Sequence, residues 1–241
     1  GKVFSRINII TSDSNIKLKS CKDLGSSHIE SHIIQYGVDK NYFKKISKDK
    51  IESVNISKNN FIIFSPRGLS SEYNIDCIMK SLSLLHKEGI KFQCVFAYNY
   101  GEKILNYYKA LAIKYQIADS LVWLGYVEYE NMPDLYNLSD VVISFPVIDS
   151  SPKCVYEALF CKSTVIVSDL NWSYDFLREE IIRVESNNHI KLYESLIDIF
   201  KNPEIKKNKI EKNYERIINY YDYEYNMKKI EKIMYNSINK K

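Results

Sequence analysis

The sequence has few of the residues that mark several common classes of protein. Its five cysteines fall singly, with no Cys-x-x-Cys pair and an odd total, so we expect core thiols rather than disulfides or a zinc site. Among only seven glycines there is no Gly-x-Gly-x-x-Gly or Walker motif, which argues against NAD-binding and P-loop sites. No apolar run approaches the roughly 20 residues that a membrane span needs, and the start lacks the apolar block of a signal peptide. These absences favour a cytoplasmic protein.

The composition is typical of a globular chain. Its 241 residues, 45% hydrophobic and 27% charged, are enough for one large or two small cores. The net charge of +4 is concentrated near the C-terminus, where residues 201–241 hold ten lysines and Arg216 against six acidic residues. Two interpretations stay open, namely solvated helices or attraction to an anionic membrane surface. Nucleic-acid binding is not predicted, because no recognised module accompanies the charge.

Short apolar runs alternate with longer amphipathic ones through the middle of the chain. The short runs, rich in β-branched and aromatic residues, predict strands at 61–64, 92–98, 120–124, 140–145 and 163–168. The longer runs, with apolar residues at spacings of three and four, predict helices at 74–89, 102–117, 130–139 and 151–162. This alternation predicts an α/β fold with a Rossmann-like, doubly wound parallel sheet. Ligands of such sheets bind beyond the carboxyl ends of the strands.

The two ends of the chain differ from the middle. Before about residue 45 the pattern predicts one strand at 6–11, a helix around 14–24, and a turn at Gly37 and Asp39. Beyond about residue 187 it predicts three helical segments. A break is expected at Pro203, because proline ends one helix and fits the first turn of the next.

The segment 149–162 predicts a helix start that suits an anion. Ser151 is a favoured N-cap and Pro152 fits the first helical position. The N–H groups of Lys153 and Cys154 would then be unpaired. Together with the positive end of the helix dipole, they would suit a phosphate or diphosphate.

Two acidic residues, Asp149 and Glu157, surround this helix start. Asp149 lies in the preceding loop and Glu157 inside the helix, so both would face the same crevice. A carboxylate beside a phosphate site is poorly placed to bind phosphate but well placed to accept hydrogen bonds from sugar hydroxyls. The pattern therefore predicts a nucleotide sugar as ligand. The alternative is that Asp149 is an ordinary loop residue and Glu157 an ordinary surface residue of the helix.

Four segments together resemble glycosyltransferase family 4, the glycosyl transferases group 1. Residues 135–169 resemble the family signature, an acid followed after seven residues by a glutamate, here Asp149 and Glu157. Residues 33–43 resemble the hinge that enters the second domain of the family. Residues 64–76 resemble its first strand with the following loop, and residues 122–127 resemble its Phe-Leu-Gly loop.

The resemblance implies a GT-B fold, in which two Rossmann-like domains face each other across a cleft and the C-terminal one holds the nucleotide sugar. Residues 1–40 would be a remnant of the N-terminal acceptor domain with the hinge. Residues 41–200 would be the nucleotide-sugar-binding domain, and residues 201–241 C-terminal helices that pack back on it. The missing N-terminal domain of the same enzyme would be a partner, and the fragment alone would be inactive.

The resemblance also implies an activity. The whole enzyme would be a retaining, metal-independent glycosyltransferase of the hexosyltransferase type that builds a bacterial surface glycan. Its donor would be a UDP-sugar or GDP-sugar, its acceptor lipid-linked or a glycan, and it would need no cofactor and no metal. Its place would be in the cytoplasm, peripheral to the inner face of the membrane.

By the same resemblance, the catalytic residues would be Arg67, Asp149 and Glu157. Glu157 would hold the ribose hydroxyls, Asp149 and the Ser150–Pro152 turn would meet the donor sugar, and Arg67 would neutralise the diphosphate. The backbone of residues 125–127 would edge the base. The complete predicted binding set is Arg67, Gly125, Tyr126, Val127, Asp149, Ser150, Ser151, Pro152, Lys153, Cys154 and Glu157.

The sequence departs from the family pattern at several positions. Tyr73 stands where the family has its diphosphate lysine and Asn74 where it has a glycine; the first acid is an aspartate, and residues 161–163 replace the usual Cys-Gly-x. The missing lysine removes one positive charge opposite the diphosphate, so a different donor affinity or a different donor stays open. Two other functions also stay open: a non-catalytic nucleotide-sugar-binding or scaffold module, and a GT-B sugar-nucleotide epimerase.

Some single residues also have ordinary structural interpretations. Arg67, at the end of a strand, would pair with a nearby acid. Trp123 and Tyr126 fit core and loop packing better than a shelf for base stacking. His28 and His32 are spaced by four, but the glutamate between them is not where a zinc-protease motif requires it, so no metal site is predicted.

Overall fold

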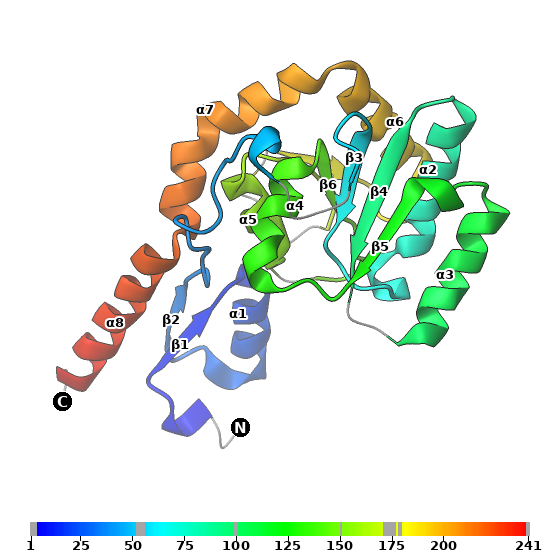
Figure 1. The fold of residues 1–241 in the computed structure, drawn as a ribbon. Coiled ribbons are helices and arrows are strands. Elements are labelled where there is room, and N and C mark those ends of the chain that lie inside the picture. Colours follow the sequence, from blue (N-terminus) through cyan, green and yellow to red (C-terminus); the bar gives the residue numbers. More distant parts are fainter. Residues whose placement is uncertain are drawn as a thin grey trace.

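The computed structural model describes residues 4–51, 56–98, 101–149, 151–170, 177 and 180–239, without the side chains of residues 5, 205 and 206. These residues form a two-stranded parallel sheet near the start of the chain and a six-stranded parallel sheet after it. Figure 1 shows helices on both sides of the larger sheet, and the smaller sheet next to the last helix.

Helices and strands alternate along the chain between residues 61 and 168. The strands are β1 (Ile9–Ser12), β2 (Glu30–Ile33), β3 (Phe61–Ser65), β4 (Phe92–Ala97), β5 (Leu121–Gly125), β6 (Val141–Ser144), β7 (Thr164–Ser168) and β8 (Ile181–Val184). The α-helices are α1 (Asn15–Cys21), α2 (Ile75–Lys87), α3 (Glu102–Lys114), α4 (Met132–Leu138), α5 (Lys153–Phe160), α6 (His189–Lys201), α7 (Pro203–Tyr221) and α8 (Tyr223–Asn239). The elements expected between residues 61 and 168 are present, with ends shifted by at most three residues.

Short helical turns join several of these elements. A π-helical turn at Lys22–Ser26 follows α1 directly. The 3-10 turns are Phe4–Arg6, Lys48–Lys50, Ser71–Tyr73, Ala118–Ser120 and Tyr129–Asn131.

The strand order of the larger sheet places its ligand-binding edge. The order is β5-β4-β3-β6-β7-β8, with each neighbouring pair parallel. The chain runs from β3 outward to β4 and β5 on one side, and then returns to β6 on the other side of β3. The boundary between β3 and β6 is therefore the topological switch point, where ligands bind in open α/β sheets. The predicted Rossmann-like, doubly wound fold is confirmed.

Alternate residues of the central strands pack into two separate cores. Ile62 and Phe64 of β3 lie in the core that includes residues of α4, α5 and α7. Phe61 and Ile63 lie in the core that includes residues of α2, α3 and α6. Because both faces of the sheet are covered, β3 reads as a continuous apolar run instead of an alternating one.

Two strands of the structure are absent from the sequence-based prediction. β2 pairs with β1, placing Ile9 opposite Glu30, and β8 extends the larger sheet beside β7. Three of the four residues of β2 are polar, and none of the four is fully buried. A small, half-exposed sheet imposes no apolar pattern, so the hydrophobic period gave no signal for β2.

The segment that leaves the smaller sheet is bound to the junction of α7 and α8. The Val38 amide donates to the Tyr221 carbonyl at 2.7 Å, and the Tyr223 amide donates to the Val38 carbonyl at 3.1 Å. Gly37 has a φ of +79°, and a Cβ there would lie 2.6 Å from the Tyr223 Cα atom. A glycine is therefore required both by backbone conformation and by the close approach of the second segment.

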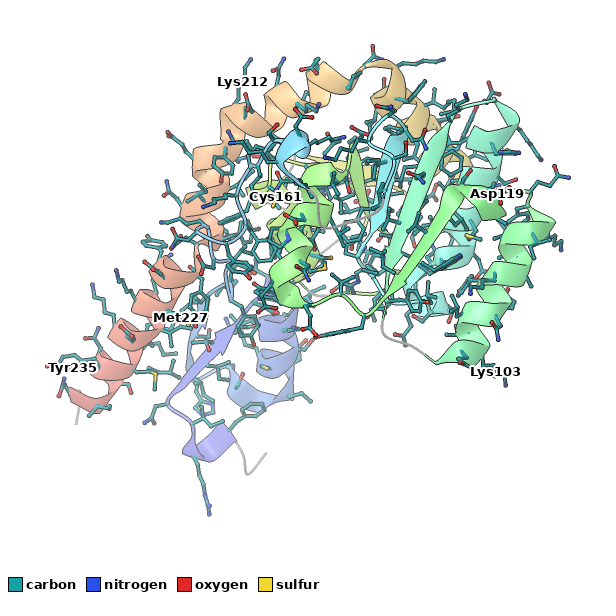
Figure 2. All side chains as sticks on the ribbon, viewed as in Figure 1. Lys103, Asp119, Cys161, Lys212, Met227 and Tyr235 are labelled. Atoms are coloured by element: carbon teal, nitrogen blue, oxygen red, sulfur yellow. The ribbon has the colours of Figure 1, made fainter. Side chains whose placement is uncertain are left out.

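The last two helices pack on different parts of the protein. Ile210, Ile217 and Tyr221 of α7 are buried in the core that contains α5. α8 runs away from the larger sheet beside β1 and β2 (Figure 1), where Lys232 and Ile233 line a pocket with residues of both strands. Figure 2 shows Lys212 pointing outward from α7. None of the described helices combines the length and apolar character that crossing a bilayer requires.

Candidate functional site

Arg67 and Asp149 meet at the topological switch point. Arg67 lies in the loop after β3, and Asp149 in the loop after β6. The Arg67 Nη2 atom lies 2.8 Å from Asp149 Oδ2, and the two side chains are only 17% and 11% exposed. The interpretation of Arg67 as the partner of a nearby acid is therefore correct.

Arg67 has two further contacts. Its guanidinium carbon lies 4.3 Å from the centroid of the Tyr73 ring, a cation–π geometry. Its Nη1 atom donates to the Cys154 thiol at 3.7 Å. Cys154 belongs to the first turn of α5, so the guanidinium stands beside the start of this helix. Tyr73, which stands where the family pattern has a lysine, therefore places its ring against the Arg67 guanidinium.

The start of α5 differs in one respect from the prediction. The helix begins at Lys153, with Pro152 in the capping position at φ −70° and ψ 106° and no side-chain capping bond. Ser151 was expected to be the N-cap, and this prediction is wrong. Its hydroxyl instead donates to Gln35 Oε1 at 2.8 Å and lies 3.1 Å from the Tyr156 hydroxyl. Gln35, on the segment between the two sheets, competes for this hydroxyl, and no local pattern in the sequence reveals that.

Glu157 is buried, with 6% of its surface exposed. The Tyr136 hydroxyl donates to Glu157 Oε2 at 2.8 Å, and the Lys153 ammonium lies 3.9 Å from Oε1. Burial raises the pKa of Glu157 above its ordinary value, while the Tyr136 hydrogen bond and the Lys153 charge oppose this rise. The alternative that Glu157 is a surface residue is therefore wrong.

An aromatic cluster surrounds the other side of Lys153. The Lys153 ammonium lies 3.3 Å from the Tyr129 hydroxyl and 4.9 Å from the centroid of its ring. Tyr129 stacks on Tyr42 with an interplanar angle of 7°. Burial, followed by the nearby charge of Glu157, raises the pKa of Tyr129 to about 12, so its hydroxyl stays protonated at neutral pH.

Sequence reasoning missed both Tyr129 and Tyr136. A signal for Tyr136 exists in hindsight, because it occupies an apolar position of an expected helix. A buried tyrosine there needs a partner for its hydroxyl. Nothing in the sequence names that partner. The contact with Glu157 joins α4 to α5, and it follows from how α4 packs on β3 and α5 on β6.

A pocket of about 420 Å³ opens beyond the carboxyl ends of β3, β4 and β5. Its walls come from the end of β4, the start of α4 and the segments that follow the three strands: Pro66, Gly68, Tyr73, Ala97, Tyr98, Tyr126, Val127 and Met132. Tyr126 and Val127, which were predicted to border the base, line this pocket. Gly125 precedes them with a φ of +72°. Trp123 stacks on Phe96 at 4.8 Å, as core packing predicts, whereas Tyr126 is 63% exposed at the pocket.

The predicted site residues fall into three groups around this edge of the sheet. Arg67, Asp149 and Cys154 form the first, and Lys153 with Glu157 form the second. The third consists of the loop residues at the pocket. Pro152 joins the first two groups at the helix start, while Ser151 turns toward Gln35. Ser150, also predicted, lies outside the described residues.

The described part of the chain contains no group of three or more His, Cys, Asp or Glu side chains arranged to hold a metal ion. Of the histidine pair considered from the sequence, His32 contacts Glu30, with its Nε2 atom 2.9 Å from Oε1. The positive groups at the switch point are Arg67, Lys153 and the first turn of α5.

Solved structures with the same fold include glycosyltransferases and their relatives. Sucrose-phosphate synthase from Thermosynechococcus elongatus superposes with a TM-score of 0.85 at 12% identity, covering 100% of this chain and 61% of that one. A glycosyltransferase from Rickettsia africae gives 0.82 at 19% identity, covering 96% and 65%. The Anabaena protein HepE, solved with UDP and glucose, gives 0.81 at 12% identity, covering 94% and 62%. The chain thus spans less than two thirds of these relatives.

Sequence comparison gives the family. No match was found among curated protein sequences. The profile described as "Glycosyl transferases group 1" matches residues 46–216, which include the whole six-stranded sheet and the three groups of site residues. Because this match covers well over half of the chain and the fold agrees with it, the chain belongs to the glycosyl transferases group 1 family.

Proposed function

We propose that this chain forms the nucleotide-sugar-binding part of a retaining, metal-independent glycosyltransferase of the hexosyltransferase type. The observation that carries the proposal is the convergence of Arg67, Asp149, Glu157 and the start of α5 at the topological switch point, beside an open pocket. A cation and free helix amides suit a diphosphate, and carboxylates suit hydroxyls. A nucleotide sugar combines all of these groups in one molecule.

The pocket is assigned to the base. It has the size of a small-ligand site, and tyrosines form part of its walls. The backbone of residues 125–127 borders it and offers polar groups to a base edge. From there the ribose extends toward Glu157, whose carboxylate accepts bonds from the ribose hydroxyls.

The diphosphate is assigned to Arg67 and the first turn of α5. As the bond between the sugar and the diphosphate breaks, negative charge grows on the leaving oxygen. Positive groups that already surround this position stabilise that charge without reorganisation. Arg67 and the helix amides therefore do the work that a metal ion performs in other transferases, which is the basis for proposing metal independence. Asp149, with the turn that follows it, is assigned to the donor sugar.

The identity of the donor rests on relatives. HepE was solved with UDP and glucose, and a pneumococcal transferase with UDP and GlcNAc. We therefore favour a UDP-sugar over a GDP-sugar. A lipid-linked or glycan acceptor and a role in a bacterial surface glycan belong to the same proposal, together with a cytoplasmic place at the membrane.

Isothermal titration calorimetry on the purified 241-residue chain tests the proposal. UDP, GDP, UDP-glucose and UDP-GlcNAc are titrated with and without EDTA. Of the two nucleotides, UDP and GDP, we expect one to bind at least about tenfold more tightly than the other, a difference of about 1.4 kcal/mol. EDTA should have no effect on either affinity. A chain that binds none of the four ligands would instead be a scaffold. Because relatives are longer, we expect no sugar transfer by this chain alone, and transfer from any of these donors to a lipid or glycan acceptor would contradict that.

A further inference from the structure

Tyr136, which lies within the segment 135–169 that resembles the family signature, donates a hydrogen bond to Glu157 inside the protein. Tyr136 is 0% exposed and Glu157 6% exposed. The Tyr136 ring packs between aromatic neighbours, with centroids 5.3 Å from Phe64 and 6.0 Å from Phe43. The buried ring is therefore held among other aromatic rings, and its hydroxyl donates to one carboxylate oxygen.

The same carboxylate has a different partner at its other oxygen. Oε2 accepts the Tyr136 hydroxyl at 2.8 Å, whereas Oε1 faces the half-exposed ammonium of Lys153 at 3.9 Å. A distance of 3.9 Å is too long for a hydrogen bond, and the same ammonium donates to the Tyr129 hydroxyl at 3.3 Å. The structure thus divides the carboxylate into a fixed inner oxygen and an outer oxygen that remains available to a ligand.

We propose that Tyr136 is a positioning residue for Glu157: its buried hydroxyl holds the inner oxygen and so presents the outer oxygen to the ribose hydroxyls. This inference rests on the proposed function and adds a residue to it. An ionised carboxylate is costly to bury, and a hydrogen bond to its charged form offsets part of that cost. Tyr136 itself does not touch the ligand.

Other titratable groups face α5, but they act differently on Glu157. Lys153 and Cys154 belong to α5 itself, Cys161 follows it, and Tyr129 approaches from the turn before α4. On α7, the Tyr214 hydroxyl donates to the Phe160 carbonyl and Tyr221 stacks on Tyr156, so both contact other residues of α5. Unlike these groups, Tyr136 donates its hydroxyl directly to the Glu157 carboxylate.

The test is the pH dependence of nucleotide binding in wild type, Tyr136→Phe and Tyr108→Phe. Tyr108→Phe is the matched control, because it also removes a buried hydroxyl that donates to a carboxylate, that of Asp76. Affinity for UDP is measured by calorimetry between pH 5 and pH 8. In Tyr136→Phe, Glu157 takes up its proton at higher pH. We expect the pH at which affinity is half lost to rise by about one unit, and affinity at neutral pH to fall about two- to tenfold.

A second measurement separates positioning from mere packing. Wild type should bind UDP more tightly than 2′,3′-dideoxy-UDP, which lacks the ribose hydroxyls. This preference should fall in Tyr136→Phe and stay unchanged in Tyr108→Phe, since only Tyr136→Phe disturbs Glu157. In a Glu157→Gln background, Tyr136→Phe should have no further effect on either quantity.

The outcomes distinguish this inference from the proposed function. If wild type binds no nucleotide, the proposed function fails first. If wild type binds UDP but Tyr136→Phe keeps the same pH profile and the same dideoxy ratio, the positioning role is overturned. A Tyr136→Phe chain that does not fold would also overturn it, because the hydroxyl would then be a requirement of the fold.

Discussion

Arg67 and Asp149 form an ion pair of 2.8 Å across the boundary between β3 and β6, where the direction of the chain through the sheet reverses. Before a donor binds, the guanidinium is thus already matched with a carboxylate. A diphosphate must share Arg67 with Asp149 or displace it. The pair therefore gives Asp149 two effects on binding, one through the sugar and one through Arg67.

Asp149→Asn should separate these two effects. The change removes the charge that competes for Arg67, so affinity for bare UDP should stay equal or rise. The additional affinity that a sugar gives should fall by about 1.5–3 kcal/mol, the range for hydrogen bonds to charged groups. Calorimetry with UDP and a UDP-sugar measures both. Asp119→Asn is the control, because Asp119 precedes β5, at the end of the strand away from the pocket (Figure 2). It should change neither the affinity for UDP nor the additional affinity from the sugar. A large loss of UDP affinity in Asp149→Asn would contradict the assignment.

Glu157→Gln should weaken nucleotide binding without unfolding the protein. Glutamine keeps the size of the side chain and can still accept from Tyr136, but it loses the charge. We expect UDP affinity to fall by about 1.5–3 kcal/mol, or about ten- to a hundredfold, with little change in the melting temperature. Glu194→Gln, on the exposed face of α6, serves as control. If Glu157→Gln melts the domain but leaves UDP binding intact at low temperature, the glutamate is structural.

The raised pKa of Glu157 predicts a pH dependence of stability. Burial raises this pKa above 4.5, so at intermediate pH the folded state binds more protons than the unfolded state. The free energy of unfolding of wild type, relative to Glu157→Gln, should then fall as pH rises from 4.5 through the folded pKa. One proton limits the slope to about 1.4 kcal/mol per pH unit. Urea unfolding of both proteins at several pH values measures it, and a difference that increases with pH would contradict the burial argument.

Gly37→Ala should destabilise the protein strongly. A Cβ at this position meets the Tyr223 backbone at 2.6 Å, in addition to the strain of a φ of +79°. Gly89→Ala is the matched control, because its φ is +75° but nothing lies within 4 Å of the added carbon. We expect about 1 kcal/mol of destabilisation for Gly89→Ala from conformation alone, and clearly more for Gly37→Ala. Equal losses in denaturant unfolding would show that the backbone relaxes around residue 37.

The basic C-terminal helices predict binding to an anionic surface. α8 exposes Lys228 and Lys232 together with Met234 and Ile238. Co-sedimentation with anionic vesicles should exceed that with neutral ones and weaken as salt rises. Lys228→Glu with Lys232→Glu should reduce it by about 1 kcal/mol per lysine, whereas the same changes at Lys103 and Lys114 of α3 should have a small effect. Equal binding to neutral and anionic vesicles would contradict membrane attraction and favour the alternative, that these helices are basic only because they face solvent.

The sequence alone determined five of the six strands of the larger sheet, all but β8, and the place of its ligand edge. A strand buried on both faces is apolar through its centre, as β3 is at residues 61–64 and β7 at residues 165–167, and helices between such strands carry an apolar period. Those requirements are local, so they are readable from the sequence. The eight-residue step from Asp149 to Glu157 is also local, because it depends only on a loop entering a helix.

The tertiary structure alone decided which side chains meet. Ser151 bonds Gln35 instead of capping α5, Arg67 pairs with Asp149, and Glu157 lies over Tyr136. Each contact joins elements that are distant in the chain. Hydrogen bonds and ion pairs of this kind depend on side-chain directions that are fixed only when helices pack on the sheet. The hydrophobic period specifies which face of a helix or strand is buried. It does not specify which polar group of a neighbouring element that face contacts.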